Sequence, residues 1–85
     1  MKTKVIYKSE SEEARVVEDY LRDVTRQTGH ILETIDPDSK DGIALCNAYG
    51  IVQYPTLLAL SDDGQMQNMW VGLPLPTISE ISYYV

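Results

Sequence analysis

The sequence predicts an α/β fold in which a four-stranded mixed sheet packs against three helices, in the order βαβαββα. Two observations lead to this prediction. In the first 50 residues, short strand-like runs alternate with segments of helical periodicity, which favours a parallel pairing of the first two strands. Two further strand-like runs then flank an Asp-Gly turn at Asp63-Gly64, which favours an antiparallel hairpin.

The first strand and helix follow from side-chain type and spacing. Residues 3–7 are rich in β-branched and aromatic side chains, which predicts a central strand. Apolar residues then recur at helical spacing between Ala14 and Val24, and Gly29 is a typical helix stop. Ser9 and Glu12 have the spacing of a capping box, which predicts that this helix begins near residue 9.

The remaining elements are shorter. Residues 30–35 return to strand character, and residues 39–49 predict a second helix that is weakened at its first turn by a glycine. Residues 56–60 and 66–71 are the two arms of the hairpin. A second capping box opens a last short helix over residues 77–85.

The length of 85 residues predicts one domain, residues 1–85. The net charge of −6 argues against a nucleic-acid-binding surface, because phosphate binding needs clustered Lys and Arg. No run approaches the ~20 apolar residues of a membrane span, and no signal peptide is evident. The sequence therefore predicts a cytoplasmic protein that binds neither nucleic acid nor membrane.

No cofactor or metal site is expected. His30 is a lone histidine with no second ligand at a suitable spacing. The carboxylates of Asp36, Asp38 and Asp41 lack the glycine and the terminal glutamate of a calcium loop, so a role in helix capping is the simpler interpretation. The single cysteine, Cys46, excludes an internal disulfide.

One stretch resembles a known family. Tyr49-Gly50-Ile51, followed by residues 54–58 (Tyr-Pro-Thr-Leu-Leu) and by Val71-Gly72, resembles the second half of thioredoxins and glutaredoxins. The order βαβαββα is that of the minimal thioredoxin fold, so the resemblance covers nearly the whole chain. It implies that the Tyr54-Pro55 bond is cis and lies beside the active site, where backbone groups bind an extended substrate.

The reactive half of such a site is missing. Disulfide exchange in this family needs Cys-x-x-Cys at the start of the first helix, where amide groups stabilise a thiolate. The resemblance puts Ser11 at the position of the nucleophilic cysteine and Ala14 at that of the resolving one. A serine hydroxyl there is not ionised and acts as a capping residue, and Glu12 and Glu13 would oppose any thiolate. No catalytic residue is predicted.

The leading hypothesis is therefore a redox-inactive thioredoxin-like domain that binds a protein or an extended peptide in the groove beside the proline. The candidate binding residues are Ser11, Glu12, Ala14, Tyr54, Pro55 and Gly72. The simpler alternative is that Tyr54-Pro55 only turns the chain into the third strand.

Two other functions stay open. The protein could be a thiol-disulfide oxidoreductase that works through Cys46, or a variant of an enzyme whose cysteine pair is here Ser11 and Ala14, although Cys46 is expected to be buried in the second helix. It could also be a structural subunit that pairs with itself or with a larger protein through its C-terminal helix, since Tyr83, Tyr84 and Val85 leave an apolar end. A monomer or weak homodimer is expected.

Overall fold

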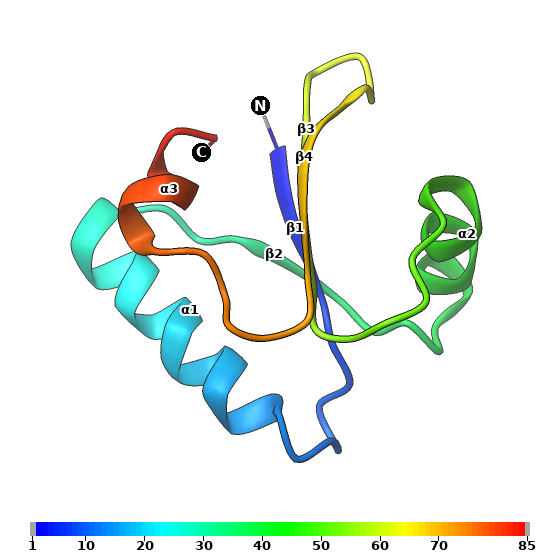
Figure 1. The fold of residues 1–85 in the computed structure, drawn as a ribbon, viewed down its shortest axis with the longest axis horizontal. Coiled ribbons are helices and arrows are strands. Elements are labelled where there is room, and N and C mark those ends of the chain that lie inside the picture. The colour runs from blue at the N-terminus through cyan, green and yellow to red at the C-terminus, as the bar shows by residue number, and fades with distance from the viewer. Residues whose placement is uncertain (1, 85) are drawn as a thin grey trace.

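The computed structural model describes residues 2–84 and has three layers. A mixed sheet lies in the middle, with α1 and α3 on one face and α2 on the other (Figure 1). The elements are β1 (Lys2–Ile6), α1 (Ala14–Thr28), β2 (Glu33–Ile35), α2 (Lys40–Tyr49), β3 (Thr56–Leu60), β4 (Met66–Val71) and α3 (Ile78–Ser82). The predicted fold class and the order βαβαββα are confirmed.

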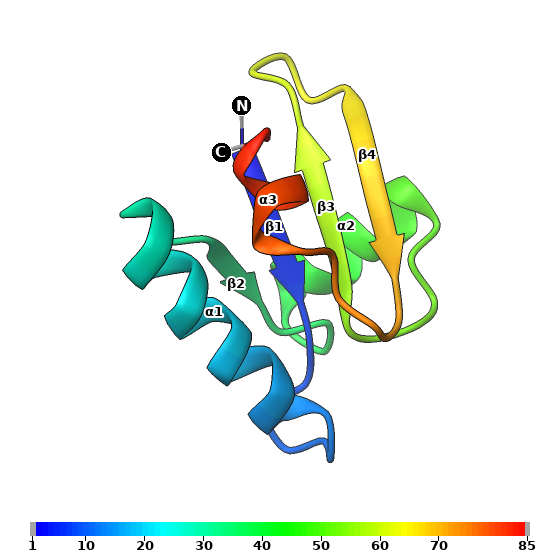
Figure 2. The ribbon, with the colours of Figure 1, turned by 60° about the vertical axis from the view of Figure 1, so that its left-hand side comes forward.

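The sheet has the strand order β2-β1-β3-β4 (Figure 2). β1 pairs with β2 in parallel, whereas the pairs β1–β3 and β3–β4 are antiparallel. β3 lies in the interior of the sheet between helices on both faces, and all five of its residues are buried. This explains why β3 is a continuous apolar run and does not alternate with polar residues.

Two hydrophobic clusters fill the space on either side of the sheet. On the side of α1 and α3 the buried residues are Val5, Val17, Val24, Leu32, Leu57 and Ile81. On the side of α2 they are Ile6, Cys46, Ile51, Leu58 and Leu60. Successive residues of a strand face opposite sides of a sheet, so Trp70 packs on the first cluster and the preceding Met69 on the second.

The predicted start of α1 is wrong. α1 begins at Ala14, its N-cap residue is Glu13, and no side chain caps it. The hydroxyl of Ser11 instead donates a hydrogen bond of 2.7 Å to the carbonyl oxygen of Lys8. Local hydrogen bonding by a serine competes with helix formation, so residues 9–13 form turns and the Ser9 capping box does not form.

β2 is shorter than the predicted strand over residues 30–35. The carbonyl oxygen of His30 accepts a hydrogen bond of 3.0 Å from the hydroxyl of Thr25, which ties the segment after α1 back to that helix. Leu32 is buried in the cluster beneath α1 before the chain reaches the sheet. The pairing with β1 therefore starts only at Glu33.

The other helix starts agree with the sequence. The Ser39 hydroxyl accepts from the Gly42 N–H at 3.0 Å and caps α2. The Thr77 hydroxyl accepts from the Glu80 N–H at 3.1 Å, and the Glu80 carboxylate accepts from the Thr77 N–H at 3.2 Å. The capping box predicted for the last helix is thus present.

β4 forms one edge of the sheet. The Gly72 N–H donates to the Pro55 carbonyl, so Pro55 and Gly72 are a hydrogen-bonded pair of the ladder between β3 and β4. In an antiparallel ladder hydrogen-bonded and non-hydrogen-bonded pairs alternate, so the pair Leu58–Met69 is not hydrogen-bonded. The N–H of Met69 therefore points away from β3. The Asn68 side chain accepts this N–H at 2.8 Å and donates to the Tyr84 hydroxyl at 3.3 Å. A side chain thereby occupies one open donor of the edge strand.

Candidate functional site

The predicted binding residues come together at one end of the sheet. Ser11, Glu12 and Ala14 lie at the start of α1, Tyr54 and Pro55 lie before β3, and Gly72 follows β4. The connections that carry them lie at the same end of the molecule (Figure 1). The six residues therefore lie at the same end of the sheet, and within residues 2–84, of the segments that carry them, only those of Pro55 and Gly72 are joined by a backbone hydrogen bond.

Gly72 and Pro55 are in direct backbone contact. The Gly72 N–H donates to the Pro55 carbonyl oxygen at 2.8 Å, and the Tyr54-Pro55 peptide bond is cis. Pro55 is fully buried, so its ring presents no surface to a ligand in this structure. Gly72 has φ = +72°, a left-handed conformation that favours glycine, which explains the residue type at this position.

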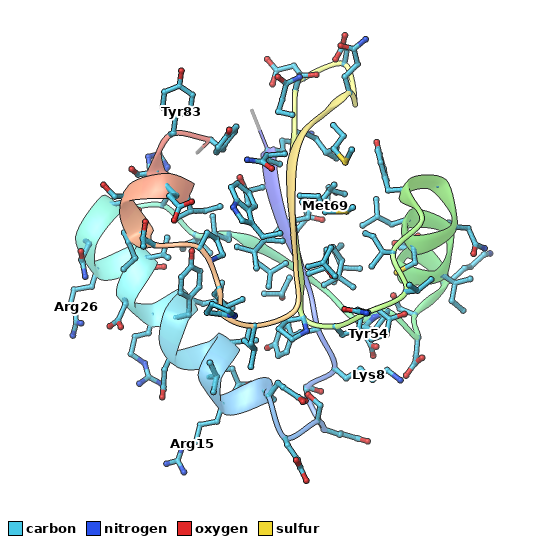
Figure 3. The ribbon with its side chains drawn as sticks, viewed as in Figure 1. Lys8, Arg15, Arg26, Tyr54, Met69 and Tyr83 are labelled. Atoms are coloured by element: carbon cyan, nitrogen blue, oxygen red, sulfur yellow. The ribbon has the colours of Figure 1, made fainter. Side chains whose placement is uncertain are left out.

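Tyr54 turns toward α2. Its ring packs against the cluster that contains Cys46, and the Nζ of Lys8 lies 5.5 Å from the centre of the ring. Figure 3 shows the side chains of Lys8 and Tyr54 next to each other below α2. Burial raises the pKa of the Tyr54 hydroxyl, and its contact with the Cys46 thiol and the charge of Asp38 act in the same direction.

The backbone of Tyr54 remains open. Among residues 2–84, no backbone group forms a hydrogen bond with its N–H or its carbonyl oxygen. The next residues have internal partners: the Pro55 carbonyl accepts from Gly72, and the Thr56 hydroxyl donates to the Gln53 carbonyl at 2.6 Å. Within residues 2–84, the donor and the acceptor at the position before the proline thus have no backbone partner.

The start of α1 offers no nucleophile. The Ser11 hydroxyl is engaged with the Lys8 carbonyl, to which the Ser11 N–H also donates at 3.1 Å. Ala14 is only 6% exposed, whereas Glu12 is exposed. Ser11 is therefore not the capping residue that the sequence predicts, and its hydroxyl stabilises the turn before the helix.

Cys46 is buried, as the sequence predicts. It is 8% exposed, lies in α2 and packs in the cluster with Ile51 and Leu58. Sequence reasoning missed the contact of its thiol with the Tyr54 hydroxyl, which links Cys46 to the residue before the proline.

An apolar hollow next to Gly72 was also missed. It has a volume of about 710 Å³ and is lined by Val16, Asp19, Tyr20, Asp23, Leu73, Pro74 and Leu75. Val16 and Leu73 are each 49% exposed, an unusual degree for large aliphatic side chains that lie together. One sequence feature could have indicated this hollow: Val16 is an apolar residue at the margin of the apolar stripe of the first helix. Its partner segment, residues 73–75, reads in the sequence only as a connection that contains proline.

Within residues 2–84, no group of three or more His, Cys, Asp or Glu side chains is placed to hold a metal ion. In the same part of the chain, no helix combines the length and the apolar character needed to cross a membrane.

No protein-family model matches the sequence, and no curated protein matches it. Among solved structures, the chain is similar to thioredoxin 1 from the thermophilic eubacterium Thermosipho africanus TCF52B, with a TM-score of 0.67. The similarity covers 99% of this chain and 89% of that chain at 13% sequence identity. At this identity the likeness concerns the fold alone. Together with the strand order and the three helices, it shows that the chain has a thioredoxin-like fold.

Proposed function

We propose that this protein is an interaction module that binds an extended segment of a partner protein at the end of the sheet where Pro55 and Gly72 meet, and that it does not exchange disulfides. The observation that carries the proposal is the apolar hollow between α1 and Leu73–Leu75, which directly follows Gly72. Binding sites for short segments combine apolar pockets with backbone groups that fix the orientation of the ligand.

The hollow suits an apolar side chain of the partner. Val16 and Leu73 leave about half of their surface in water in the free protein, and covering them releases that water. Tyr20 also lines the hollow and packs on the core cluster below, so the floor is fixed by the fold. An apolar residue of an extended segment would fill this space.

The open backbone groups of Tyr54 support the extended conformation of the ligand. A strand-like segment pairs through its own N–H and carbonyl groups, so its affinity does not depend on one particular sequence. Specificity would come from the side chain that enters the hollow next to Leu73.

Charge favours a neutral or basic partner. Asp19 and Asp23 line the hollow and contribute negative charge, and the chain as a whole carries a net charge of −6. Each aspartate pairs with an arginine one turn further along α1, Arg22 and Arg26, in exposed ion pairs. Exposed pairs are weak, so a basic residue of a partner can exchange with them.

The state of the Ser11 hydroxyl and of the Cys46 thiol also favours a binding role over disulfide exchange. The Ser11 hydroxyl is occupied, and Cys46 is buried in a cluster against which Tyr54 packs. An oxidoreductase that works through Cys46 would need a movement of Tyr54 before a substrate disulfide could reach the sulfur.

The experiment is selection of peptides from a random displayed library, followed by affinity measurement on two matched variants. Leu73→Asp puts a charge in the hollow, whereas Val52→Asp makes the same change on a side chain that is 82% exposed and does not line it. We expect Leu73→Asp to weaken the selected peptides by about tenfold or more and Val52→Asp to leave them nearly unchanged. Equal losses in both variants, or no enriched peptide, would contradict the proposal.

A redox assay separates the alternative function. We expect no turnover in insulin reduction with a dithiol reductant, because no thiolate is available at the start of α1. The double variant Ser11→Cys, Ala14→Cys should show exchange if the fold alone is competent. Turnover by the natural sequence that disappears in Cys46→Ser would establish the oxidoreductase instead.

A further inference from the structure

A second recess lies between the edge strand β4 and α3. It has a volume of about 340 Å³, and its lining residues are Asn68, Trp70, Ser79, Glu80, Tyr83 and Tyr84. None of these residues lines the apolar hollow beside Leu73, so the two sites are separate. Figure 3 shows Tyr83 at the end of α3, near the C-terminus.

Three aromatic rings form one wall of the recess. Trp70 and Tyr84 pack edge to face with their ring centres 5.3 Å apart and an interplanar angle of 76°. Tyr83 and Tyr84 have the same separation and an angle of 69°. In an edge-to-face pair the edge of one ring points at one face of the other, so the opposite face of that second ring is not covered by this neighbour.

The central ring is held in place before any ligand binds. The Tyr84 hydroxyl accepts a hydrogen bond from Asn68 at 3.3 Å, and the Tyr84 carbonyl oxygen accepts one from the Thr3 hydroxyl at 3.2 Å. Trp70 packs on the core cluster beneath α3. A site whose rings are already fixed loses little conformational entropy on binding.

The charge of the recess has one sign. Glu80 is the single charged residue among those that line it, and no Lys, Arg or His is among them. One carboxylate oxygen, Oε1, accepts from the N–H and the hydroxyl of Thr77, at 3.2 and 3.1 Å. The capping box thus fixes the carboxylate, and within residues 2–84 no hydrogen bond engages its second oxygen.

We propose that this recess binds an arginine side chain of a partner protein. Aromatic faces attract cations, and a neighbouring carboxylate adds to the attraction. A planar guanidinium can stack on a ring and donate to the free Glu80 oxygen at the same time, which a lysine ammonium cannot do. The net charge of −6 also favours the approach of a basic partner.

The test is an NMR titration of the isotope-labelled protein with N-acetyl-arginine N-methylamide. The neutral analogue N-acetyl-citrulline N-methylamide has nearly the same shape and serves as the control ligand. We expect saturable shifts of the Trp70 indole N–H with the arginine compound, weaker shifts with its lysine counterpart, and none with citrulline. Equal shifts with arginine and citrulline, or no saturable shift with arginine, would overturn the proposal.

Two variants assign the binding to the recess. Glu80→Gln removes the charge but keeps a side chain that can complete the capping box. Tyr83→Ala removes a ring that is 78% exposed, and Ile31→Ala is its control because Ile31 is 84% exposed and lies outside the recess. We expect Glu80→Gln and Tyr83→Ala each to weaken arginine binding about two- to fivefold, and Ile31→Ala to leave it unchanged. Unchanged binding in both recess variants would refute the site.

Discussion

The ammonium group of Lys8 lies 5.5 Å from the centre of the Tyr54 ring, and Tyr54 also packs against the cluster that holds Cys46. Lys8 also lies 3.7 Å from the carboxylate of Asp38. Tyr54 thus contacts both a cation and the apolar layer beneath α2. Cys46, the one cysteine of the chain, is only 8% exposed and contacts the Tyr54 hydroxyl, so we expect Tyr54 to limit access to the thiol.

We expect Tyr54→Ala to make Cys46 reactive. Removing the ring opens the side of the thiol that faces the proline turn, so labelling by a chromogenic disulfide should accelerate by about tenfold, whereas Tyr54→Phe should stay close to the natural rate. Thr77→Ala, which destabilises the protein at a different place, controls for labelling through unfolding. Equal acceleration in Thr77→Ala would show that Tyr54 is not a local cover.

Gly42→Ala should destabilise the protein, although alanine is the better helix former. A Cβ at this position would lie 1.9 Å from the carbonyl oxygen of Asp36, so the backbone before α2 would have to move. We expect a loss of about 2 kcal/mol or more in the free energy of unfolding, measured with urea. The opposite change at an exposed site of the same helix, Ala44→Gly, should cost about 1 kcal/mol through helix propensity alone. A stabilised Gly42→Ala protein would contradict the close approach.

The two capping boxes predicted from the sequence should respond differently to mutation. Thr77→Ala removes the hydroxyl that accepts the Glu80 N–H, and we expect a loss of about 1 kcal/mol in the free energy of unfolding. Ser9→Ala should change it by less than about 0.5 kcal/mol, because Ser9 lies in a turn before α1 and caps nothing. A cost at Ser9 equal to that at Thr77 would place the start of α1 where the sequence predicts it.

Tyr20 makes stability depend on alkaline pH. Burial, together with the charge of Glu80, raises the pKa of its hydroxyl from 10.0 to about 12. The unfolded chain therefore loses this proton first, and the contribution of Tyr20 is complete below pH 10 and falls as the pH rises toward 12. Burial raises the pKa of Tyr7 and Tyr54 as well, so the total fall has several sources.

The variant Tyr20→Phe measures how much of the loss of stability at alkaline pH comes from Tyr20. The Tyr20 hydroxyl is buried and has no hydrogen-bond partner within residues 2–84, so at about pH 9 the variant should be as stable as the natural protein or slightly more stable. At about pH 11 its urea midpoint should have fallen less than that of the natural protein. Parallel losses in the two proteins would assign the alkaline instability to other groups.

The hairpin was the easiest part to predict from sequence. Thr56–Leu60 and Met66–Val71 have the predicted bounds, because strong β character on both sides of an Asp-Gly turn leaves few other arrangements. The start of α1 was harder. Ser9 and Glu12 have the spacing of a capping box, but the Ser11 hydroxyl donates to the Lys8 carbonyl and stabilises a turn in place of the first helical turn. Residue spacing alone does not show which of these two local structures forms.

The sequence predicts which residues of the candidate site lie at the same end of the sheet, but not the direction of their side chains or the shape of the surface they form. The resemblance brings Ser11, Tyr54, Pro55 and Gly72 to one end of the sheet. It does not say that Tyr54 packs toward α2, because that direction depends on the space next to Cys46. The hollow beside Leu73 arises from two segments far apart in the sequence, so no local pattern indicates it.

The side chain of Asn68 has a consequence for the behaviour of the protein at high concentration. Because it occupies the outward N–H of Met69 and is itself tied to Tyr84, the rim of the sheet offers a second copy one donor fewer for strand pairing. Unpaired backbone groups along an exposed edge strand can pair with another chain and lead to aggregation. We therefore expect replacement of the Asn68 amide by an apolar side chain to make pairing between the edges of two copies easier.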